Sequence, residues 1–164
     1  MTFRAVNRKG CADYDPGLQR HHLLPRQLLR VRAFTPLFDA VSHERLHFDD
    51  FRTNGLLLPA RSNACVRLGL PLHRGPHRRY NELVIERVGQ IERGWAGAKA
   101  QDPDAALREA LFRLSLLQAT LRRQLVDPPG RRMQLHSRDP IGTGFDFTEL
   151  DAMAEQMWAE TATS

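Results

Sequence analysis

The clearest pattern of hydrophobic and polar positions lies in the second half of the chain, where apolar residues recur at helical spacing. Between residues 76 and 94 they gather on one face of a helix: Tyr80, Leu83, Val84, Val88 and Ile91. Pro76 suits the first helical position, where its missing N–H costs nothing, and Gly94 marks the expected end. The pattern therefore predicts a helix over residues 76–94.

A longer amphipathic helix is predicted over residues 102–126. Asp102 is a suitable N-cap, and Pro103 suits the first turn. Leucines at three- and four-residue intervals give this helix an apolar stripe: Leu107, Leu111, Leu114, Leu117, Leu121 and Leu125. Such a stripe is typical of a core face or of a dimer face.

Short extended segments are predicted in the first half of the chain. Residues 18–24 favour a strand that is stopped by Pro25, because the residue before a proline avoids helical backbone. Asn54-Gly55 is a strong turn signal. The leucines at 56–58 then predict a second short strand.

Three further segments are predicted to be helical. Residues 26–38 favour a short helix with Leu28, Leu29 and Phe34 facing inward and Pro36 breaking its end, and residues 61–68 favour one or two turns. After a basic loop, Thr148 and Asp151 form a capping-box pattern that opens a last helix within residues 145–164. The chain as a whole, residues 1–164, is predicted to be a single α+β domain with more helix than strand.

The net charge of +5 comes almost wholly from arginine, since Lys9 and Lys99 are the only lysines. Arginine binds phosphate through two parallel hydrogen bonds, whereas lysine acts as a point charge. A polyanionic partner is one interpretation, and a base composition that encodes arginine easily is the other. Charge alone does not decide between them.

The two cysteines, Cys11 and Cys65, form no metal knuckle, and we expect unpaired, buried thiols in a reducing cytoplasm. No apolar run is long enough for a membrane span, and no membrane partner is expected. Residues 1–10 lack the apolar centre of a signal peptide. A cytoplasmic location, or export by a toxin route that needs no signal peptide, is therefore expected.

Five residues stand out for phosphodiester hydrolysis: His21, His22, Asn54, His73 and His77. A divalent cation neutralises charge that develops on the phosphate, and a neutral imidazole accepts the proton of the attacking water. Adjacent strand residues point to opposite sides, so His21 and His22 can serve one site only where the strand ends or twists. Pro25 makes such an end the expected arrangement.

His73 and His77 are four residues apart and would share one face of a helix. If Pro76 begins the helix instead, His73 lies on the entering loop and His77 in the first turn. Either geometry can bring both rings to one ion, and three imidazoles with an open position make a catalytic type of metal shell. Each residue alone has a plain structural alternative, either a surface or core histidine or a turn asparagine.

Three segments in the same order resemble the AHH family of HNH/endonuclease VII nucleases: residues 19–25 (QRHHLLP), 54–59 (NGLLLP) and 73–81 (HRGPHRRYN). The layout is also similar to the DNase domains of nuclease colicins. The resemblance covers about residues 21–88. It implies a ββα-metal (His-Me finger) core over residues 18–94, with additional C-terminal helices.

The resemblance also implies a role for each residue of the three segments. His22 matches the general base, and Asn54 matches the residue that fixes the base-bearing loop through backbone hydrogen bonds. His21, His73 and His77 match the ligands of one divalent cation, whether magnesium, manganese, nickel or zinc.

Several residues around the three segments are expected to contact phosphate. Arg74, Arg78 and Arg79 surround the expected ligands, although a solvated helix start is the alternative reading. Tyr80 and Asn81 match the family's terminal pair, which serves in phosphate contact or in packing. Arg20 stands where the family name expects alanine, and it too is expected to contact phosphate.

The predicted function is that of a hydrolase, a metal-dependent endonuclease that cuts DNA with little sequence preference. RNA cleavage is a variant, and a non-enzymatic nucleic-acid-binding module with a structural zinc is the alternative. AHH-like domains often form the toxic parts of bacterial polymorphic toxins. The resemblance therefore implies a toxin role and an immunity protein as a second partner.

Overall fold

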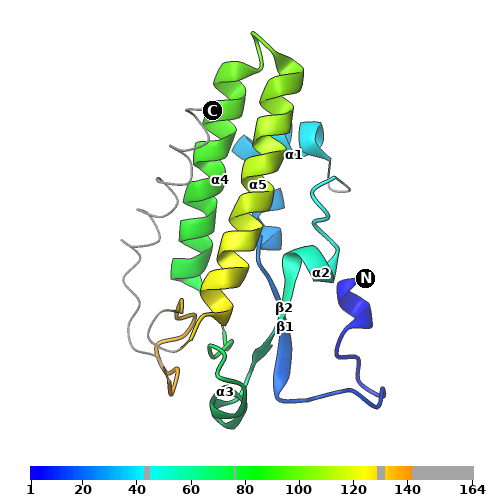
Figure 1. The fold of residues 1–164 in the computed structure, drawn as a ribbon, viewed down its shortest axis with the longest axis vertical. Coiled ribbons are helices and arrows are strands. Elements are labelled where there is room, and N and C mark those ends of the chain that lie inside the picture. Colours follow the sequence, from blue (N-terminus) through cyan, green and yellow to red (C-terminus); the bar gives the residue numbers. More distant parts are fainter. Residues whose placement is uncertain (43–44, 76, 129–131, 142–164) are drawn as a thin grey trace.

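The computed structural model describes residues 1–42, 45–75, 77–128 and 132–141 (Figure 1). Its elements follow in the order η1 (Phe3–Ala5), β1 (Leu18–His22), η2 (Arg26–Arg30), η3 (Arg32–Phe34), α1 (Thr35–Val41), α2 (Phe51–Asn54), β2 (Gly55–Pro59), α3 (Ser62–Leu68), α4 (Arg78–Ala98) and α5 (Pro103–Val126). The expected α+β class is therefore confirmed. The helix predicted within residues 145–164 lies outside the described residues.

The two strands form a small antiparallel sheet in which His21 lies opposite Leu56 and His22 opposite Gly55. The long helices α4 and α5 run antiparallel, side by side, and the sheet lies at the end where α4 begins and α5 finishes (Figure 1). No helix in the described part of the chain is long and apolar enough to cross a bilayer.

The core fills the space between the α4–α5 pair, α1 and the residues that follow β1. It consists of fully or nearly fully buried apolar side chains, among them Leu23, Leu24, Leu28, Leu37, Phe38, Val84, Val88, Leu114, Leu121, Leu125 and Met133. The predicted leucine stripe of α5 faces this core at Leu114, Leu117, Leu121 and Leu125. The stripe is therefore a core face rather than a free dimer face.

The predicted helix over residues 26–38 is wrong in its detail. The segment contains two 3₁₀ turns, η2 and η3, joined by Val31 in extended backbone, and the α-helix begins only at Thr35. Pro36 therefore stands in the first turn of α1 rather than at a helix end, because a residue without an N–H loses nothing there. The inward positions of Leu28 and Phe34 are confirmed, whereas Leu29 is only half-buried against the core.

The turn predicted at Asn54-Gly55 is also wrong. Asn54 ends α2, and Gly55 begins β2 directly in extended backbone. The glycine is needed for a different reason, since a Cβ at Gly55 would lie 2.3 Å from Cδ2 of Phe51. Gly55 therefore leaves the room at the start of the strand that the Phe51 ring occupies.

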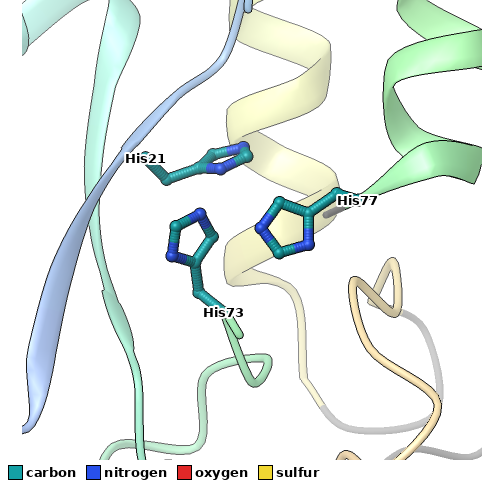
Figure 2. A group of neighbouring side chains, drawn as sticks. All are labelled: His21, His73 and His77. Carbon is teal, nitrogen blue, oxygen red and sulfur yellow. The ribbon is translucent and has the colours of Figure 1, made fainter. Parts of the chain in front are cut away.

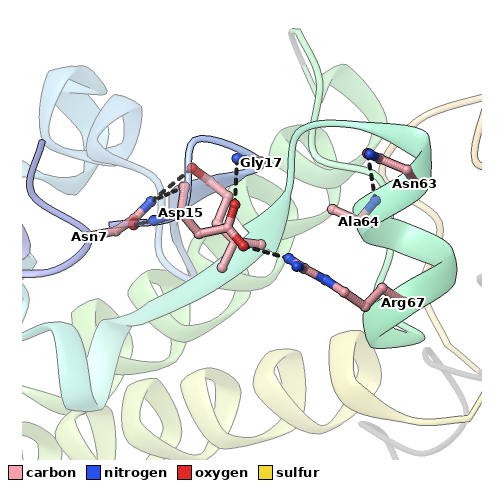
Figure 3. Close-up of polar contacts among 7 residues, drawn as sticks. Asn7, Asp15, Gly17, Asn63, Ala64 and Arg67 are labelled. Atoms are coloured by element: carbon pink, nitrogen blue, oxygen red, sulfur yellow. Dashed lines mark hydrogen bonds and ion pairs between the residues drawn. The ribbon is translucent and has the colours of Figure 1, made fainter. Parts of the chain in front are cut away.

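The residues before β1 are held against the sheet by polar contacts (Figure 3). Asn7 donates from Nδ2 to the carbonyl oxygens of Asp15 and Leu18, at 2.9 and 3.0 Å. The carboxylate of Asp15 accepts from the N–H of Gly17 at 2.7 Å and pairs with Arg67 of α3 at 2.5 Å. Because these donors favour the charged form, they lower the pKa of Asp15.

Candidate metal centre

Three histidines from separate parts of the chain come together beside the start of α4. His21 lies on β1, His73 on the segment after α3, and His77 at the N-cap of α4. One ring nitrogen of each lies within 4.8 Å of a ring nitrogen of the others, and the three rings face one another (Figure 2). Of the two geometries considered for His73, the entering loop is the one observed, although α4 begins at Arg78, so that His77 precedes the first turn instead of lying in it.

The backbone explains why these three rings meet. The N–H of His73 donates to the carbonyl of Pro59 at 2.7 Å, which fastens the His73 segment to the end of β2. His21 lies on β1, the strand paired with β2, and the start of α4 brings His77 to the same place. Ring centroids of His73 and His77 are 4.4 Å apart, and those of His21 and His73 are 4.8 Å apart.

The polar atoms inside this cluster fit a cation. Nε2 of His21 and Nδ1 of His73 are buried without a hydrogen-bond partner among the described residues. Buried polar atoms are normally satisfied, so orphaned nitrogens on two rings of the cluster indicate a missing partner. Imidazole nitrogens are ligands for zinc, nickel and related ions, and the donor set therefore suits a borderline divalent metal.

The same burial keeps the cluster neutral. Burial lowers the pKa of His21 well below its ordinary value, and burial with repulsion from His77 lowers the pKa of His73 to about 4. Burial also lowers the pKa of His77, although the hydrogen bond to the Leu135 carbonyl opposes this. Metal binding requires neutral imidazoles, so at neutral pH no proton has to leave first.

His22 lies next to the cluster and does not join it. Its ring stacks on Phe3, with centroids 3.7 Å apart and planes 4° from parallel, and Nε2 has no partner among the described residues. Burial and the nearby Arg26 lower the pKa of His22. The alternation expected for adjacent strand residues therefore directs His21 and His22 to different surroundings.

Asn54 is fully buried at the junction of α2 and β2. Its Oδ1 accepts from the N–H of Leu24 at 2.7 Å, and its Nδ2 donates to the carbonyls of Leu24 and Phe48 at 3.2 and 2.9 Å. The carbonyl of Asn54 accepts from Leu23 N–H at 2.8 Å. These bonds hold the two residues that directly follow His22.

The residues expected to contact phosphate divide into two groups. Arg20, Arg74, Arg78 and Arg79 are exposed, and of these only Arg20 forms a side-chain hydrogen bond with a described residue, to the carbonyl of Phe3 at 2.8 Å. Tyr80 is buried, and its hydroxyl donates to the carbonyl of Leu23 at 2.6 Å, which favours packing over phosphate contact. Asn81 is half-buried, and its Nδ2 lies 3.3 Å from Oε1 of Gln27.

Sequence reasoning missed several side chains that support this site. Phe3 stacks on His22, and Gln118 of α5 donates from Nε2 to Oδ1 of Asn54 at 3.2 Å. Arg122 of α5 donates to the carbonyls of Arg52, Thr53 and Gly55. A signal for Gln118 did exist, because it is a polar residue on the face that carries Leu114 and Leu121. Phe3 carried no such signal.

The cysteines are both unpaired, as expected, although only Cys65 is buried and Cys11 is half-buried. Neither joins the histidine cluster, which contains three potential ligands among the described residues. Burial raises the pKa of the Cys65 thiol, which keeps it protonated. A closed four-ligand site of the structural zinc type therefore has no support in the described part of the chain.

Comparison with protein families identifies the class of protein that carries this site. The chain matches, over residues 2–115, a nuclease family of the HNH/ENDO VII superfamily with conserved AHH. The protein is therefore a nuclease, with nucleic acid as its class of substrate. It belongs to the AHH family. Comparisons with curated proteins and with solved structures give no significant match.

Acid is expected to destabilise the metal-free protein. His73 has a pKa of about 4 when folded against 6.5 ordinarily, so the unfolded chain binds more protons between these values. The contribution of the neutral His73 ring to the free energy of unfolding is complete above pH 6.5 and is lost as the pH falls towards 4. We expect the free energy of unfolding, measured by urea titration with a chelator present, to fall by about 2 kcal/mol from pH 7 to pH 5 through His73 alone.

The matched variant for this measurement is His73→Asn, which removes the titrating ring but keeps a polar side chain. Its pH dependence over the same range should be shallower than that of the wild type. Equal slopes for the two proteins would contradict the assignment of this effect to His73.

Proposed function

We propose that this protein is a metal-dependent endonuclease of the HNH type, which hydrolyses phosphodiester bonds of DNA with little sequence preference. The observation that carries the proposal is the convergence of His21, His73 and His77, with His22 adjacent on β1. In this proposal β1, β2 and α4 make up a ββα-metal core.

His21, His73 and His77 would hold one divalent cation. Three protein ligands leave a position open for a substrate oxygen, as in catalytic rather than structural sites. Such a cation, when bound, stabilises the negative charge that develops on the phosphate and the leaving oxygen. Because all three ligands are imidazoles, we expect zinc, nickel or manganese to bind more tightly than magnesium.

His22 would act as the general base that takes a proton from the attacking water. Its lowered pKa keeps the ring neutral at pH 7, and a neutral imidazole can accept a proton. Nε2 has no partner among the described residues that would compete for this role. The stack on Phe3 restricts the ring plane, and Asn54 restricts the backbone that follows it.

The exposed arginines around the cluster would bind the phosphates on either side of the cleaved bond. The side chains of Arg74, Arg78 and Arg79 form no hydrogen bond or ion pair with any described residue, which leaves their guanidinium groups available. Phosphate contacts carry no sequence information, so we expect a nuclease with little preference. A toxin role, an immunity protein and a route of export stay predictions from the resemblance.

The proposal is tested by incubating supercoiled plasmid with metal-depleted protein and then adding Mg²⁺, Mn²⁺, Ni²⁺ or Zn²⁺ singly. We expect relaxed and then linear DNA with at least one ion, and none with the chelator. His21→Ala should bind the metal far more weakly and lose cleavage, because two ligands remain.

The control is His47→Asn, which removes an exposed imidazole in left-handed backbone that asparagine tolerates. It should cleave like the wild type. Folded wild-type protein that cuts neither DNA nor RNA with any ion would contradict the proposal. If it binds zinc and nucleic acid all the same, the binding-module alternative gains support.

A further inference from the structure

We propose that the segment of residues 132–139, which follows α5, is part of the metal centre and sets the positions of two of its ligands. The inference rests on the proposed function, because it assumes that the histidine cluster binds a cation. The segment lies beyond residues 2–115, the part of the chain that matches the AHH family. It is therefore a contribution of this chain outside the family's matching region.

The first contact orients His77. Its Nδ1 lies 3.2 Å from the carbonyl oxygen of Leu135. A carbonyl only accepts hydrogen bonds, so Nδ1 carries the hydrogen and Nε2 keeps its lone pair. Histidine ligands commonly donate their second N–H to a carbonyl or carboxylate in this way, which fixes the tautomer and the ring orientation. Leu135 itself is buried in the core, so its carbonyl is held firmly.

The second contact holds the segment that carries His73. Leu72 donates its N–H to Oδ2 of Asp139 at 2.9 Å, and His73 donates its own to the carbonyl of Pro59 at 2.7 Å. Two consecutive backbone amides are thus bound, one to Asp139 and the other to β2. Asp139 therefore restricts the backbone from which the His73 ring projects.

Arg132 keeps Asp139 in place. Its Nη2 lies 3.1 and 3.3 Å from the two carboxylate oxygens of Asp139, and its Nη1 donates to the carbonyl of Gly69. The side chains of both residues are almost completely buried, at 3% and 0% exposed. A buried ion pair stabilises a fold little more than apolar side chains of similar volume would. Its geometry, which ties residues 132–139 to residues 69–72 directly before His73, favours a positioning role.

The rest of the segment is anchored to α5 and the core. Met133 is fully buried, and its N–H donates to the carbonyl of Gln124 at 2.8 Å. The backbone on either side of Leu135 is thereby fixed, by Met133 towards α5 and by Asp139 towards the His73 segment. The same anchored segment thus supplies both the Leu135 carbonyl that contacts His77 and the Asp139 carboxylate that contacts Leu72.

The first experiment measures the tautomer of His77 in the metal-free wild type. Long-range ¹H–¹⁵N correlation of the imidazole nitrogens distinguishes a hydrogen on Nδ1 from one on Nε2. We expect the Nδ1–H form for His77. A hydrogen on Nε2 would overturn the inference, and this outcome depends on neither metal binding nor the folding of a variant.

The second experiment compares metal binding by Asp139→Ala and Asp139→Asn with the wild type, using Zn²⁺ competition against a chromophoric chelator. Asp139→Ala removes the acceptor for Leu72 and should weaken affinity about 10- to 100-fold, the range seen when groups behind a ligand are lost. Asp139→Asn keeps one oxygen acceptor and should recover part of the affinity. Both are measured below their unfolding temperatures, checked by circular dichroism.

The matched control is Asp15→Asn, which weakens the ion pair between the loop before β1 and Arg67 of α3. It should leave both the zinc affinity and the His77 tautomer unchanged. Folded Asp139→Ala with wild-type affinity would overturn the inference while the proposed function stands. If the wild type and His21→Ala bind zinc equally weakly, the proposed metal site itself fails.

Discussion

Replacement of His22 by alanine is expected to reduce plasmid cleavage about 10²- to 10⁴-fold, the usual contribution of a general base. The ring is neutral at pH 7, its Nε2 has no partner among the described residues, and Phe3 holds its plane. Cleavage is followed as the rate of plasmid nicking at saturating metal. Bound metal, measured by elemental analysis, should stay at the wild-type level because His22 is outside the cluster.

His22→Gln is the matched variant for this measurement. Glutamine keeps a planar polar group against Phe3 but has no nitrogen that accepts a proton near neutral pH. It should fold like the wild type, bind the metal and be as inactive as the alanine variant. Cleavage by either variant within a few fold of the wild type would rule out His22 as the base, and loss of bound metal would make it a ligand.

Replacement of Asn54 by alanine is expected to have the largest effect on stability. The change removes, in a fully buried place, the amide that accepts from the N–H of Leu24 and donates to the carbonyls of Leu24 and Phe48. Each unsatisfied buried group costs about 1–3 kcal/mol, so we expect the free energy of unfolding to fall by about 3 kcal/mol or more. Urea titration monitored by tryptophan fluorescence measures this loss.

The same substitution should also slow cleavage at temperatures where the variant is folded, because the backbone after His22 loses two of its restraints. The control is Asn63→Ala, since Asn63 is exposed on α3 and, among the described residues, its side chain bonds only to the adjacent Ala64 N–H. That variant should change stability by less than about 0.5 kcal/mol. If both asparagine variants unfold at the same urea concentration, Asn54 does not have the role assigned to it.

The helices were the most predictable part of the fold. The periodic apolar residues of α4 and α5, the capping Asp102 and the proline at 103 are local signals, and the structure confirms both helices. Helix ends were less predictable, since α4 continues past Gly94 to Ala98. A Cβ at Gly94 would meet nothing within 4 Å, so this glycine sits in the open and is tolerated within the helix.

The candidate ligands could be selected from spacing and resemblance, because His21, His73 and His77 fall within three short motifs. What those motifs could not show is why the rings converge. The convergence depends on the pairing of β1 with β2 and on the bond from His73 N–H to Pro59, which join residues far apart in the chain. These hydrogen bonds join backbone atoms, which every residue has, so they produce no recognisable pattern in the sequence.

Asn54 shows the limit of local interpretation most clearly. Beside a glycine it has the local pattern of a turn, yet it is a buried residue whose amide satisfies the backbone of two other segments. By itself the sequence determined which residues are able to carry the chemistry and where the long helices run, since both are properties of residue type and spacing. Only the tertiary structure decided which side chains support the candidate site residues. Phe3, Gln118 and the buried Arg132–Asp139 pair contact segments far away in the sequence, where no spacing rule applies.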